Sequence, residues 1–346
     1  MRPYNASMPV HVEDNVSLAP YNTFGVEARA LRFARVDCAE QLPQLLADPA
    51  LSSLPRLVLG GGSNLLLTRD FEGLVIKVDV AGLQRLDPLE GCQRVRVGAG
   101  ENWHATVERL LETGLPGLEN LALIPGSVGA APIQNIGAYG LELAERFESL
   151  EAYDLQERRP LVLDAEQCRF GYRDSLFKHE PGRYVVLSVT LALPIEWQPV
   201  IGYADVEHEL KAREAACPQP RDVFDAVVAI RRRKLPDPAV IGNAGSFFKN
   251  PVVPRTTRDR LREKFPSLVS YELGGARCKL AAGWLIDACG LKGYVRGRAA
   301  VYERQALVLV NRGGATGQEI LDLAREVQDR VRQKFDIALE PEPIIV

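Results

Sequence analysis

Glycine runs flanked by polar residues are the segments of this sequence best suited to hold an anionic ligand. The clearest is Gly60-Gly61-Gly62-Ser63-Asn64, which follows the apolar stretch 56–59. Its backbone N–H groups could converge on a phosphate, because glycine allows close approach, and the serine and asparagine could add hydrogen bonds. The run is neither a Rossmann fingerprint nor a P-loop, since Leu65 takes the third glycine position and no Gly-Lys-Ser/Thr follows. A tight turn without a ligand is the alternative.

The segment 124–140 is a second candidate, because it is dense in glycine, alanine and proline and has neither helical nor strand periodicity. Such a stretch is uncommon in a compact domain unless it binds something. Its small residues would let a flat ligand touch the backbone, and its amides could face a heteroaromatic edge. A close-packed turn is the alternative. The residues singled out are Pro125, Gly126, Ser127, Gly129, Ala130, Gln134, Asn135, Gly137, Ala138 and Tyr139.

Two arginines could neutralise an anion. Arg173, within the stretch 170–175, is suited to a bidentate grip on a carboxylate or a phosphate, whereas a lone arginine is more often a surface salt-bridge partner. Arg231 begins a basic run that ends at Lys234, at the C-terminus of an expected helix. That run could neutralise a diphosphate or simply complement the helix dipole. The residues alone leave both pairs of alternatives open.

A hydroxyl and a carboxylate complete the set of candidates. Ser246 lies in the stretch 243–251, just after a glycine and between amides and a lysine, although serine in such loops is usually a cap or a turn residue. Glu342 lies close to the last residue and would ordinarily be a solvated tail charge. The acidic residues Glu119, Glu142 and Glu145 near the second candidate segment are interpreted as solvated surface.

Composition excludes several classes of protein. The 346 residues contain 42 Lys and Arg against 45 Asp and Glu, with 46% hydrophobic and 25% charged residues. These are the proportions of a globular protein and not of a collagen-like or disordered one. The net charge of -3 argues against a broad nucleic-acid-binding face. The length predicts two or three domains.

The sequence also predicts a cytoplasmic location. A signal peptide needs an apolar run of roughly 7–15 residues and a membrane span roughly 20, and neither is found. The six cysteines form no CxxC pair, which favours buried thiols in a reducing compartment. The four histidines have no zinc-ligand spacing, so no metal site is expected.

The sequence predicts some of the helices and strands that must position these residues. We expect strands at 56–59, 73–78, 94–97, 150–155, 160–163 and, with strict alternation on a half-buried sheet, 185–193. A helix over 102–113 is favoured by Asn102 as N-cap and by Gly114 at its end. Cys217-Pro218-Gln219-Pro220 ends a charged helix at 206–216 and marks a boundary.

The last third alternates helix and strand and is typical of a separate α/β domain. A helix begins at Asp222, another lies near 281–289, and a strand is expected at 306–310. A long amphipathic helix with Ile320, Leu323, Val327 and Val331 on one face precedes a short terminal strand.

Taken together, the motifs resemble those of the UDP-N-acetylenolpyruvoylglucosamine reductase (MurB) family of bacterial peptidoglycan precursor synthesis. They occur in the family's order over nearly the whole chain. The most specific are Ile124-Pro125-Gly126-Ser127-Val128-Gly129-Ala130 and Gly245-Ser246-Phe247-Phe248-Lys249-Asn250-Pro251. The other matches are Asn22-Thr23-Phe24-Gly25, the 60–64 run, the 171–175 stretch, Lys234-Leu235-Pro236-Asp237-Pro238 and Leu339-Glu340-Pro341-Glu342.

The resemblance implies an α+β or α/β fold with an FAD-binding domain of the vanillyl-alcohol-oxidase and p-cresol-methylhydroxylase type in two subdomains, followed by a C-terminal α/β substrate-binding domain. The implied limits are 1–85, 86–218 and 219–335, with the tail 336–346 packing back towards the site. The flavin pyrophosphate would lie on the 60–64 run, and the 124–140 segment would surround it with Arg231 nearby. Neither loop contains His or Cys, so the FAD is expected to be non-covalent.

The resemblance also implies the reaction and the roles in it. A hydride passes from NADPH to flavin and on to the vinyl carbon of an enolpyruvyl ether, UDP-N-acetylglucosamine enolpyruvate. Arg173 and Glu342 match the residues that polarise the carboxylate, and Ser246 matches the general acid. The positions that match substrate contacts are Tyr172, Tyr203, Lys234, Asn250 and Gln305.

The stretch 197–203 is typical of the type I subgroup, whose tyrosine-bearing loop closes over UDP. Pro343 departs from the family pattern, and because proline cannot donate to a ladder we expect a weakened terminal strand. A monomer without a nucleic-acid or membrane partner is implied. Two alternatives stay open: a flavin oxidase or dehydrogenase acting on another substrate, and a non-catalytic regulator that binds a nucleotide sugar.

Overall fold

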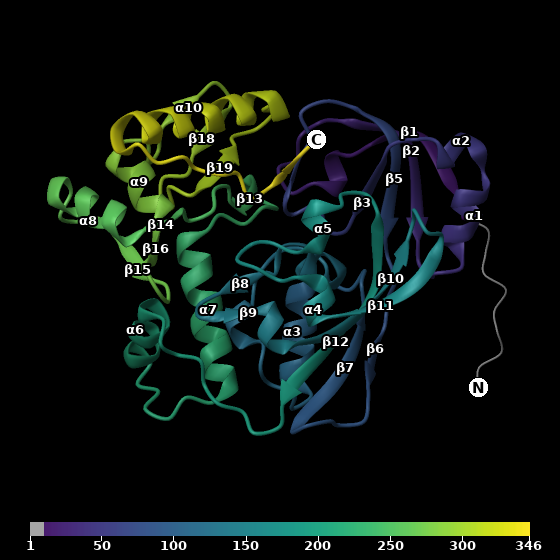
Figure 1. The fold of residues 1–346 in the computed structure, drawn as a ribbon, viewed down its shortest axis with the longest axis horizontal. Helices are drawn as coiled ribbons and strands as arrows, with labels where there is room; N and C mark the ends of the chain where they lie inside the picture. The colour runs from purple at the N-terminus through teal and green to yellow at the C-terminus, as the bar shows by residue number, and fades with distance from the viewer. Residues whose placement is uncertain (1–9) are drawn as a thin grey trace. The chain divides into compact units, whose positions relative to one another are not determined.

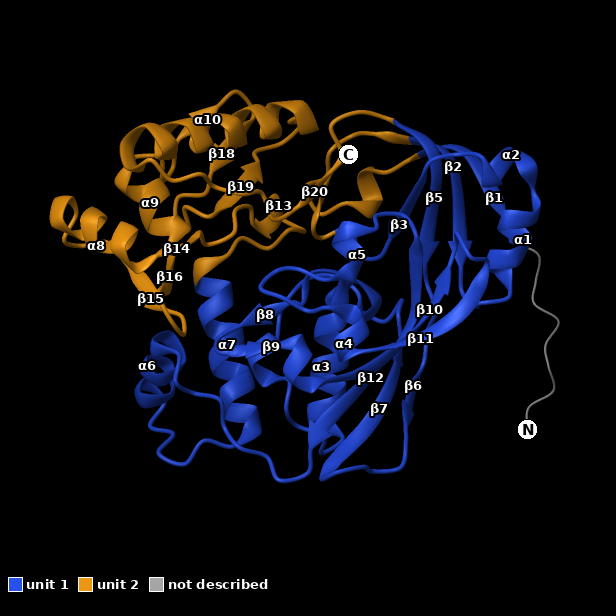
Figure 2. Ribbon diagram, viewed as in Figure 1, with its two compact units in different colours: residues 1–16, 30–62, 71–233 blue, residues 17–29, 63–70, 234–346 orange. Residues whose placement is uncertain are grey.

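The computed structural model describes residues 10–346. The prediction that the chain has no signal peptide concerns in part residues 1–9, which lie outside the described residues. The chain forms two compact units, each built from segments far apart in sequence (Figure 2). Unit 1 comprises Met1–Val16, Ala30–Gly62 and Phe71–Arg233, and unit 2 comprises Ser17–Arg29, Ser63–Asp70 and Lys234–Val346. The three-part division expected from sequence stays a prediction.

A four-stranded sheet forms one part of unit 1 (Figure 1). Its strand order is β1-β2-β5-β3, and β5 pairs in parallel with both β2 and β3. Parallel strands need a crossover connection, which α1 and α2 provide between β2 and β3. The bounds are β1 (Val12–Ser17), β2 (Arg29–Val36), α1 (Gln41–Ala47), α2 (Pro49–Ser52), β3 (Arg56–Leu59) and β5 (Phe71–Val78).

A five-stranded antiparallel sheet forms the other part of unit 1, in the order β11-β10-β12-β7-β6. The strand β12 lies at its centre and is buried on both faces from Val185 to Leu191, so the expected half-buried position is wrong. Its alternate residues Ser188 and Thr190 are small enough to be buried as well. The bounds are β6 (Leu83–Arg85), β7 (Cys92–Gly98), β10 (Phe147–Asp154), β11 (Arg159–Asp164) and β12 (Tyr184–Pro194).

Helices complete the core of unit 1. Trp103 and Val107 of α3 and Val227 and Ile230 of α7 belong to the same buried cluster as the strands of both sheets. The N-cap of α3 is confirmed, since the Asn102 side chain accepts a hydrogen bond from the Ala105 N–H at 3.0 Å. The bounds are α3 (Trp103–Glu112), α4 (Ala165–Cys168), α5 (Leu176–His179), α6 (Ala204–Ala212) and α7 (Pro220–Lys234).

The irregular segment 114–140 contains short turns instead of longer elements. Single 3₁₀ turns and two-residue strands need no sustained periodicity, which is why the sequence shows none. The elements of this region are η2 (Glu119–Leu121), η3 (Val128–Gln134), β8 (Gly137–Ala138), β9 (Leu141–Glu142) and η4 (Leu143–Arg146).

Unit 2 contains a four-stranded sheet in the order β13-β19-β18-β17, a three-stranded sheet β14-β16-β15, and a parallel pair of β4 and β20. Helix α10 packs on β18, β19 and α9 through the predicted apolar stripe. The bounds are η1 (Ala19–Tyr21), β4 (Leu65–Leu66), β13 (Gly242–Ser246), β14 (Val252–Pro254), α8 (Arg255–Lys264), β15 (Ser270–Glu272), β16 (Arg277–Leu280), α9 (Ala282–Ala288), β17 (Val295–Arg296), β18 (Ala299–Val301), β19 (Val308–Asn311), α10 (Gly317–Phe335) and β20 (Ile344–Ile345).

The predicted helices and strands are confirmed in kind, with ends that differ by a few residues. The charged helix expected over 206–216 is α6 and ends earlier, at Ala212, and the expected strand 306–310 is β19 and begins later, at Val308. Among residues 10–346, no helix has the length and apolarity required to cross a membrane.

Candidate functional site

The two glycine-rich candidate segments lie against each other in unit 1. A Cβ added to Gly60 would come within 2.5 Å of the Ser127 Oγ, and one added to Gly61 within 2.7 Å of the Gly126 Cα. Only glycine fits at such separations. Gly62 ends the run in unit 1 with a positive φ of 61°, and the chain passes to Ser63 and then Asn64 in unit 2.

The end of β7 holds the second segment in place. The Val128 N–H donates to the Glu101 carbonyl and the Gly129 N–H to the Ala99 carbonyl, both at 2.9 Å. The Trp103 N–H, at the start of α3, donates to the Gly126 carbonyl at 3.0 Å. The second candidate segment is therefore fixed to the end of a central strand and the first turn of a helix. Beyond it, η3 carries Gly129, Ala130 and Gln134, β8 carries Gly137 and Ala138, and Pro125 is half-buried just ahead.

The Ser127 hydroxyl is the feature that points most directly to a ligand. Its Oγ is buried and has no hydrogen-bond partner among the described residues. An unsatisfied buried hydroxyl is costly, and a native one calls for an explanation such as a bound group. The oxygen lies at the glycine contact between the two loops. The site therefore fits the phosphate oxygens of the expected dinucleotide, which would accept this hydrogen bond.

Arg231 is the basic residue of its run that turns towards the candidate segment. Its Nε donates to the Leu123 carbonyl at 3.2 Å, and its side chain hydrogen-bonds that of Tyr139. Burial lowers the pKa of Arg231, whereas the neighbouring Tyr139 opposes that shift. Arg233, two residues on, instead pairs with Glu209 at 3.1 Å. Of these two arginines, the one in contact with the segment is the one the sequence singles out.

Arg173 stands on a tight turn that is also fixed to the candidate segment. Gly171 and Asp174 exchange backbone hydrogen bonds of 3.0 and 3.3 Å, and Arg173 between them has a positive φ of 54°. Its guanidinium donates to the Gly137 carbonyl and lies 3.5 Å from the Asn135 carbonyl oxygen. The guanidinium carbon also lies 5.3 Å from the ring centroid of Tyr172. Bonds to carbonyls orient the arginine without neutralising its charge.

Asn135 uses its side chain within the protein. Its Nδ2 donates to Glu142 at 2.9 Å and to the Gly171 carbonyl at 3.1 Å, and its Oδ1 accepts from the Ala144 N–H at 2.9 Å. The residue is 1% exposed. Glu142, interpreted from sequence as solvated, is thus a half-buried partner of this amide.

Glu119 is the second acidic residue whose solvated interpretation is wrong, because it is 3% exposed. It accepts from the Gly117 N–H at 2.6 Å and from the Trp197 indole at 3.3 Å. Burial raises its pKa, although these hydrogen bonds oppose the shift. The carboxylate therefore anchors the segment that leads to Tyr203.

Sequence reasoning missed Asn120, next to Glu119. Its amide donates to the Val200 carbonyl at 2.7 Å and to the Tyr139 carbonyl at 2.8 Å. Tyr203 packs edge-on against Tyr139, with ring centroids 5.3 Å apart. The loop with Tyr203 is thereby joined to the candidate segment. No local signal marks Asn120, because both acceptors come from distant parts of the chain.

Ser246, in unit 2, owes its position to a bulge. The register of β13 against β19 shifts between Asn243 and Ser246, and Gly245 adopts a positive φ of 68°. The Asn243 side chain accepts from the Gly245 N–H at 2.9 Å and fixes that turn. Bulges of this kind re-aim a side chain. Ser246 is half-buried, and the completely buried Phe247 follows it.

The tail of unit 2 lies beside that strand. The Lys249 N–H donates to the Glu340 carbonyl at 2.9 Å, and the Glu342 N–H donates to the Phe247 carbonyl at 2.8 Å. The Asn64 amide donates to the Glu342 carbonyl at 3.2 Å. The main chain of Glu342 is therefore fixed on both sides, next to the residue that follows Ser246.

Pro343 does not prevent the terminal strand, contrary to the expected weakening. The Glu342 N–H before it and the Ile344 N–H after it both donate, the latter to the Asn64 carbonyl at 3.0 Å. Because successive N–H groups in a strand face opposite sides, the position at which Pro343 lacks an N–H is not one of those that donate to the neighbouring segments. The proline ring is buried. β20 begins directly after it.

The remaining expected substrate residues in unit 2 lie near the start of α9 or at the end of α7. The Asn250 Oδ1 accepts from the Ala282 N–H at 2.9 Å, and a Cβ added to Gly283 would lie 3.2 Å from the Gln305 Oε1. Both side chains thus border the first turn of α9. Lys234 is the last residue of α7.

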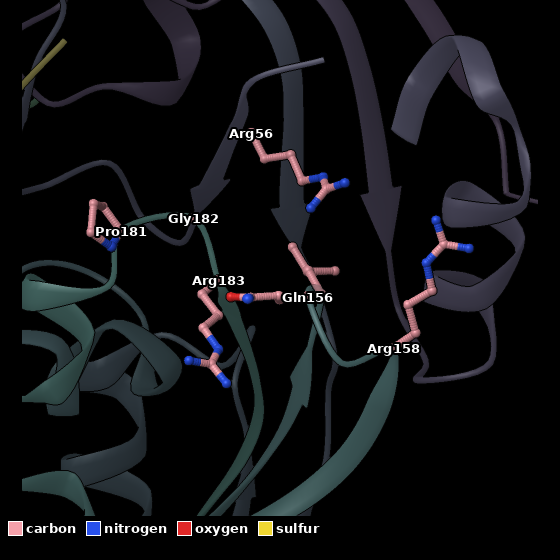
Figure 3. Close-up of a pocket in the computed structure, with 7 residues that line it drawn as sticks. Arg56, Gln156, Arg158, Pro181, Gly182 and Arg183 are labelled. Carbon is pink, nitrogen blue, oxygen red and sulfur yellow. The ribbon is translucent and has the colours of Figure 1, made fainter. Parts of the chain in front are cut away.

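A separate hollow in unit 1, of about 420 Å³, contains none of these residues (Figure 3). Arg56, Arg158 and Arg183 line it, but Arg183 is paired with Asp154 at 2.7 Å and also with Glu180. The charge of Arg183 is thereby compensated, and because none of the candidate residues lines this hollow we do not assign the site there.

Comparisons with known proteins identify the family and two of its domains. Residues 30–156 match the model of an FAD binding domain, and residues 237–346 match that of the UDP-N-acetylenolpyruvoylglucosamine reductase C-terminal domain. A Ralstonia nicotianae protein named UDP-N-acetylenolpyruvoylglucosamine reductase is 54% identical over 339 residues, which cover 97% of this chain and 99% of that protein.

Solved structures extend the comparison to the fold. The chain is similar to the UDP-N-acetylenolpyruvylglucosamine reductase of Thermus caldophilus, with a TM-score of 0.66, 28% identity and coverage of 97% and 99% of the two chains. It also shares its fold with p-cresol methylhydroxylase at a TM-score of 0.51 and 11% identity, over 95% and 85% of the two chains. The predicted mixed α/β, FAD-binding fold class is confirmed.

Proposed function

This chain belongs to the UDP-N-acetylenolpyruvoylglucosamine reductase family, an FAD-dependent group of oxidoreductases, and we propose that it reduces UDP-N-acetylglucosamine enolpyruvate with NADPH by means of Ser246, Arg173 and Glu342. The observation that carries the assignment of residues is the backbone pairing of Glu342 with Phe247. That pairing supports the proposal because it keeps the main chain of the tail beside the segment that carries the proposed acid.

The flavin is held without a covalent bond by the two glycine-rich segments. Gly60, Gly61 and Gly126 provide close backbone approach, and the Ser127 hydroxyl supplies a donor that no group within residues 10–346 uses. Arg231 lies at the same segment. When bound, FAD accepts a hydride from NADPH and delivers it to the vinyl carbon of the substrate. The further residues of this proposed binding set are Gly62, Ser63, Asn64, Pro125, Gly129, Ala130, Gln134, Gly137, Ala138 and Tyr139. The side chain of Asn135 is left out of the set because its hydrogen bonds are made within the protein.

Arg173 and Glu342 act on the enolpyruvyl carboxylate. Negative charge that develops on the carbon next to the carboxylate spreads into it, and a preorganised guanidinium stabilises that charge. Arg173 is already oriented by the Gly137 carbonyl, so little reorganisation is required. Glu342 is held through its backbone, and we assign its carboxylate to orient the substrate or the guanidinium.

Ser246 donates the proton that completes the reduction. A neutral hydroxyl is a weak acid, so its contribution to the rate depends on its position. The bulge of β13 between Asn243 and Ser246, which the Asn243 side chain stabilises, supports this role. Tyr203 and Lys234 bind the diphosphate side of the substrate. Tyr172, Asn250 and Gln305 complete the substrate contacts.

The absorption spectrum of the purified protein tests the proposal. NADPH should bleach the flavin bands, and UDP-N-acetylglucosamine enolpyruvate added without oxygen should restore them. Ser246→Ala should be bleached at the normal rate and restored at least about 100-fold more slowly. Near-normal restoration would exclude Ser246 as the acid. Rapid restoration by oxygen alone would favour the oxidase alternative, and a colourless protein the non-catalytic regulator.

We further propose that the enzyme acts as a cytoplasmic monomer without a nucleic-acid partner. The six cysteines are free thiols, which fits a reducing compartment, although only Cys168 and Cys278 are buried as expected and Cys217 is exposed. Sedimentation at micromolar concentration would detect a dimer.

A further inference from the structure

The turn that carries Arg173 is joined to the flavin-side segment by several hydrogen bonds, of which Asn135 makes two and the Gly137 carbonyl accepts another from Arg173. One amide nitrogen reaches the Gly171 carbonyl at 3.1 Å, two residues before Arg173. The backbone carbonyl of the same residue lies 3.5 Å from the Arg173 guanidinium. A second link comes from the Ser175 hydroxyl, which donates to the Ile133 carbonyl at 2.6 Å.

The geometry leaves the Asn135 amide no freedom. Both of its N–H groups and its oxygen are engaged, with Gly171, Glu142 and Ala144 as partners, and the side chain is almost completely buried. The backbone is left-handed, with φ of 45°, a conformation that asparagine tolerates better than most residues. The Asn135 carbonyl therefore has a fixed direction, and so does the Gly171 turn opposite it.

We propose that Asn135 is a positioning residue for Arg173: its carboxamide locks the 171–174 turn to the 135–137 segment, so that the guanidinium meets the substrate carboxylate in one orientation. Its side chain thus serves Arg173 instead of contacting the flavin. This inference rests on the proposed role of Arg173. Glu142 contributes by holding the second amide proton.

The test separates the two half-reactions. Asn135→Gly keeps the left-handed backbone without strain and removes the amide, and Asn135→Asp keeps the shape but turns both donors into an acceptor. For either variant, NADPH should bleach the flavin at the normal rate with a normal FAD content. Restoration by UDP-N-acetylglucosamine enolpyruvate should slow roughly 10- to 100-fold, the cost of a small misplacement.

A double-mutant cycle distinguishes positioning from general damage. In an Arg173→Ala background, Asn135→Gly should cause little further slowing, because the residue acts through the arginine. Gln93→Ala is the matched control, since Gln93 is a buried amide of unit 1 that also makes three hydrogen bonds. It should lower stability and leave restoration by the substrate unchanged.

The outcomes identify which claim fails. If Arg173→Ala restores at the normal rate, the proposed function itself is wrong. If Arg173→Ala is slow but the flavin of both Asn135 variants is reoxidised by the substrate at the normal rate, Asn135 does not position the arginine. The same conclusion follows if the slowing in the double variant equals the product of the slowings in the two single variants.

Discussion

The backbone N–H of Glu342 donates a hydrogen bond of 2.8 Å to the carbonyl oxygen of Phe247, the residue after Ser246. The Lys249 bond to Glu340 places the two segments antiparallel. The main chain of Glu342 is thus held in register with the segment that carries the proposed proton donor, and the Asn64 side chain adds a further bond to the Glu342 carbonyl.

The ladder of β20 should control the placement of Glu342. Ile344→Pro removes the bond to the Asn64 carbonyl and should lower kcat roughly 10- to 100-fold, because a displacement of about 1 Å is enough for such a loss. Ile345→Pro is the matched control, since both side chains are about equally exposed and the Ile345 N–H faces away from β4. Steady-state kinetics of the two variants checks this, and equal activities would contradict it.

Gly61→Ala should weaken the binding of FAD. The added methyl group would lie 2.7 Å from the Gly126 Cα, and a backbone atom cannot rotate away. Overpacking of this kind costs about 1–3 kcal/mol, so the dissociation constant of FAD should rise by about 10-fold or more. Flavin fluorescence during dilution measures the release. Gly274→Ala, an exposed position with open space around it, should bind FAD normally.

Lys234→Ala should act on binding and not on chemistry. The proposed contact of Lys234 with the diphosphate is equally strong in the bound substrate and in the transition state. Its loss therefore raises KM with little change in kcat. We expect KM for the UDP substrate to rise about 10-fold or more, and KM for NADPH to change less. Lys292→Ala removes an exposed lysine of the same unit as a control for charge. An unchanged KM in Lys234→Ala would refute the assignment.

His104 should make the protein sensitive to mild acid. Its Nδ1 accepts a hydrogen bond from the Leu123 N–H at 3.0 Å, and burial, aided by Arg232 and Arg231, lowers its pKa below 6.5. Because the folded state favours the neutral ring, this stability is present above pH 6.5 and is lost as pH falls below it. Urea unfolding at pH 7.5 and 5.5 should show a larger loss in the natural protein than in His104→Gln. Equal losses would contradict the argument.

The parts of the fold that could be predicted are those marked by local sequence signals, such as helix caps and apolar periodicity. Asn102 and Gly114 delimit α3 within a single stretch, and the stripe from Ile320 to Val331 defines α10 without reference to anything else. Helix caps and periodicity act between neighbours in sequence, and tertiary context had little to override. The same holds for the candidate residues marked by rare motifs, such as Ser127 and Ser246.

The features that escaped prediction depend on partners remote in sequence. Asn120 joins two segments only because the carbonyls of Tyr139 and Val200 converge on it, and the buried Glu119 accepts a hydrogen bond from the indole of Trp197, 78 residues away. The tail was expected to pack back only because of the family resemblance, since the Asn64 amide and the Glu342 carbonyl that it binds are 278 residues apart. No propensity of Pro343 could reveal that its neighbours supply the donors on both sides.

The pairing of β4 with β20 also sets an order of events during synthesis. Leu65 and Leu66 emerge from the ribosome early, but the strand that pairs with them is among the last described residues to be made. Most of unit 1 is complete by Arg233, so it can collapse while the rest is still being translated. Until Ile344 and Ile345 appear, the edge of β4 needs protection, and the interval before they do is the stage at which the nascent chain is most exposed to aggregation or to a chaperone.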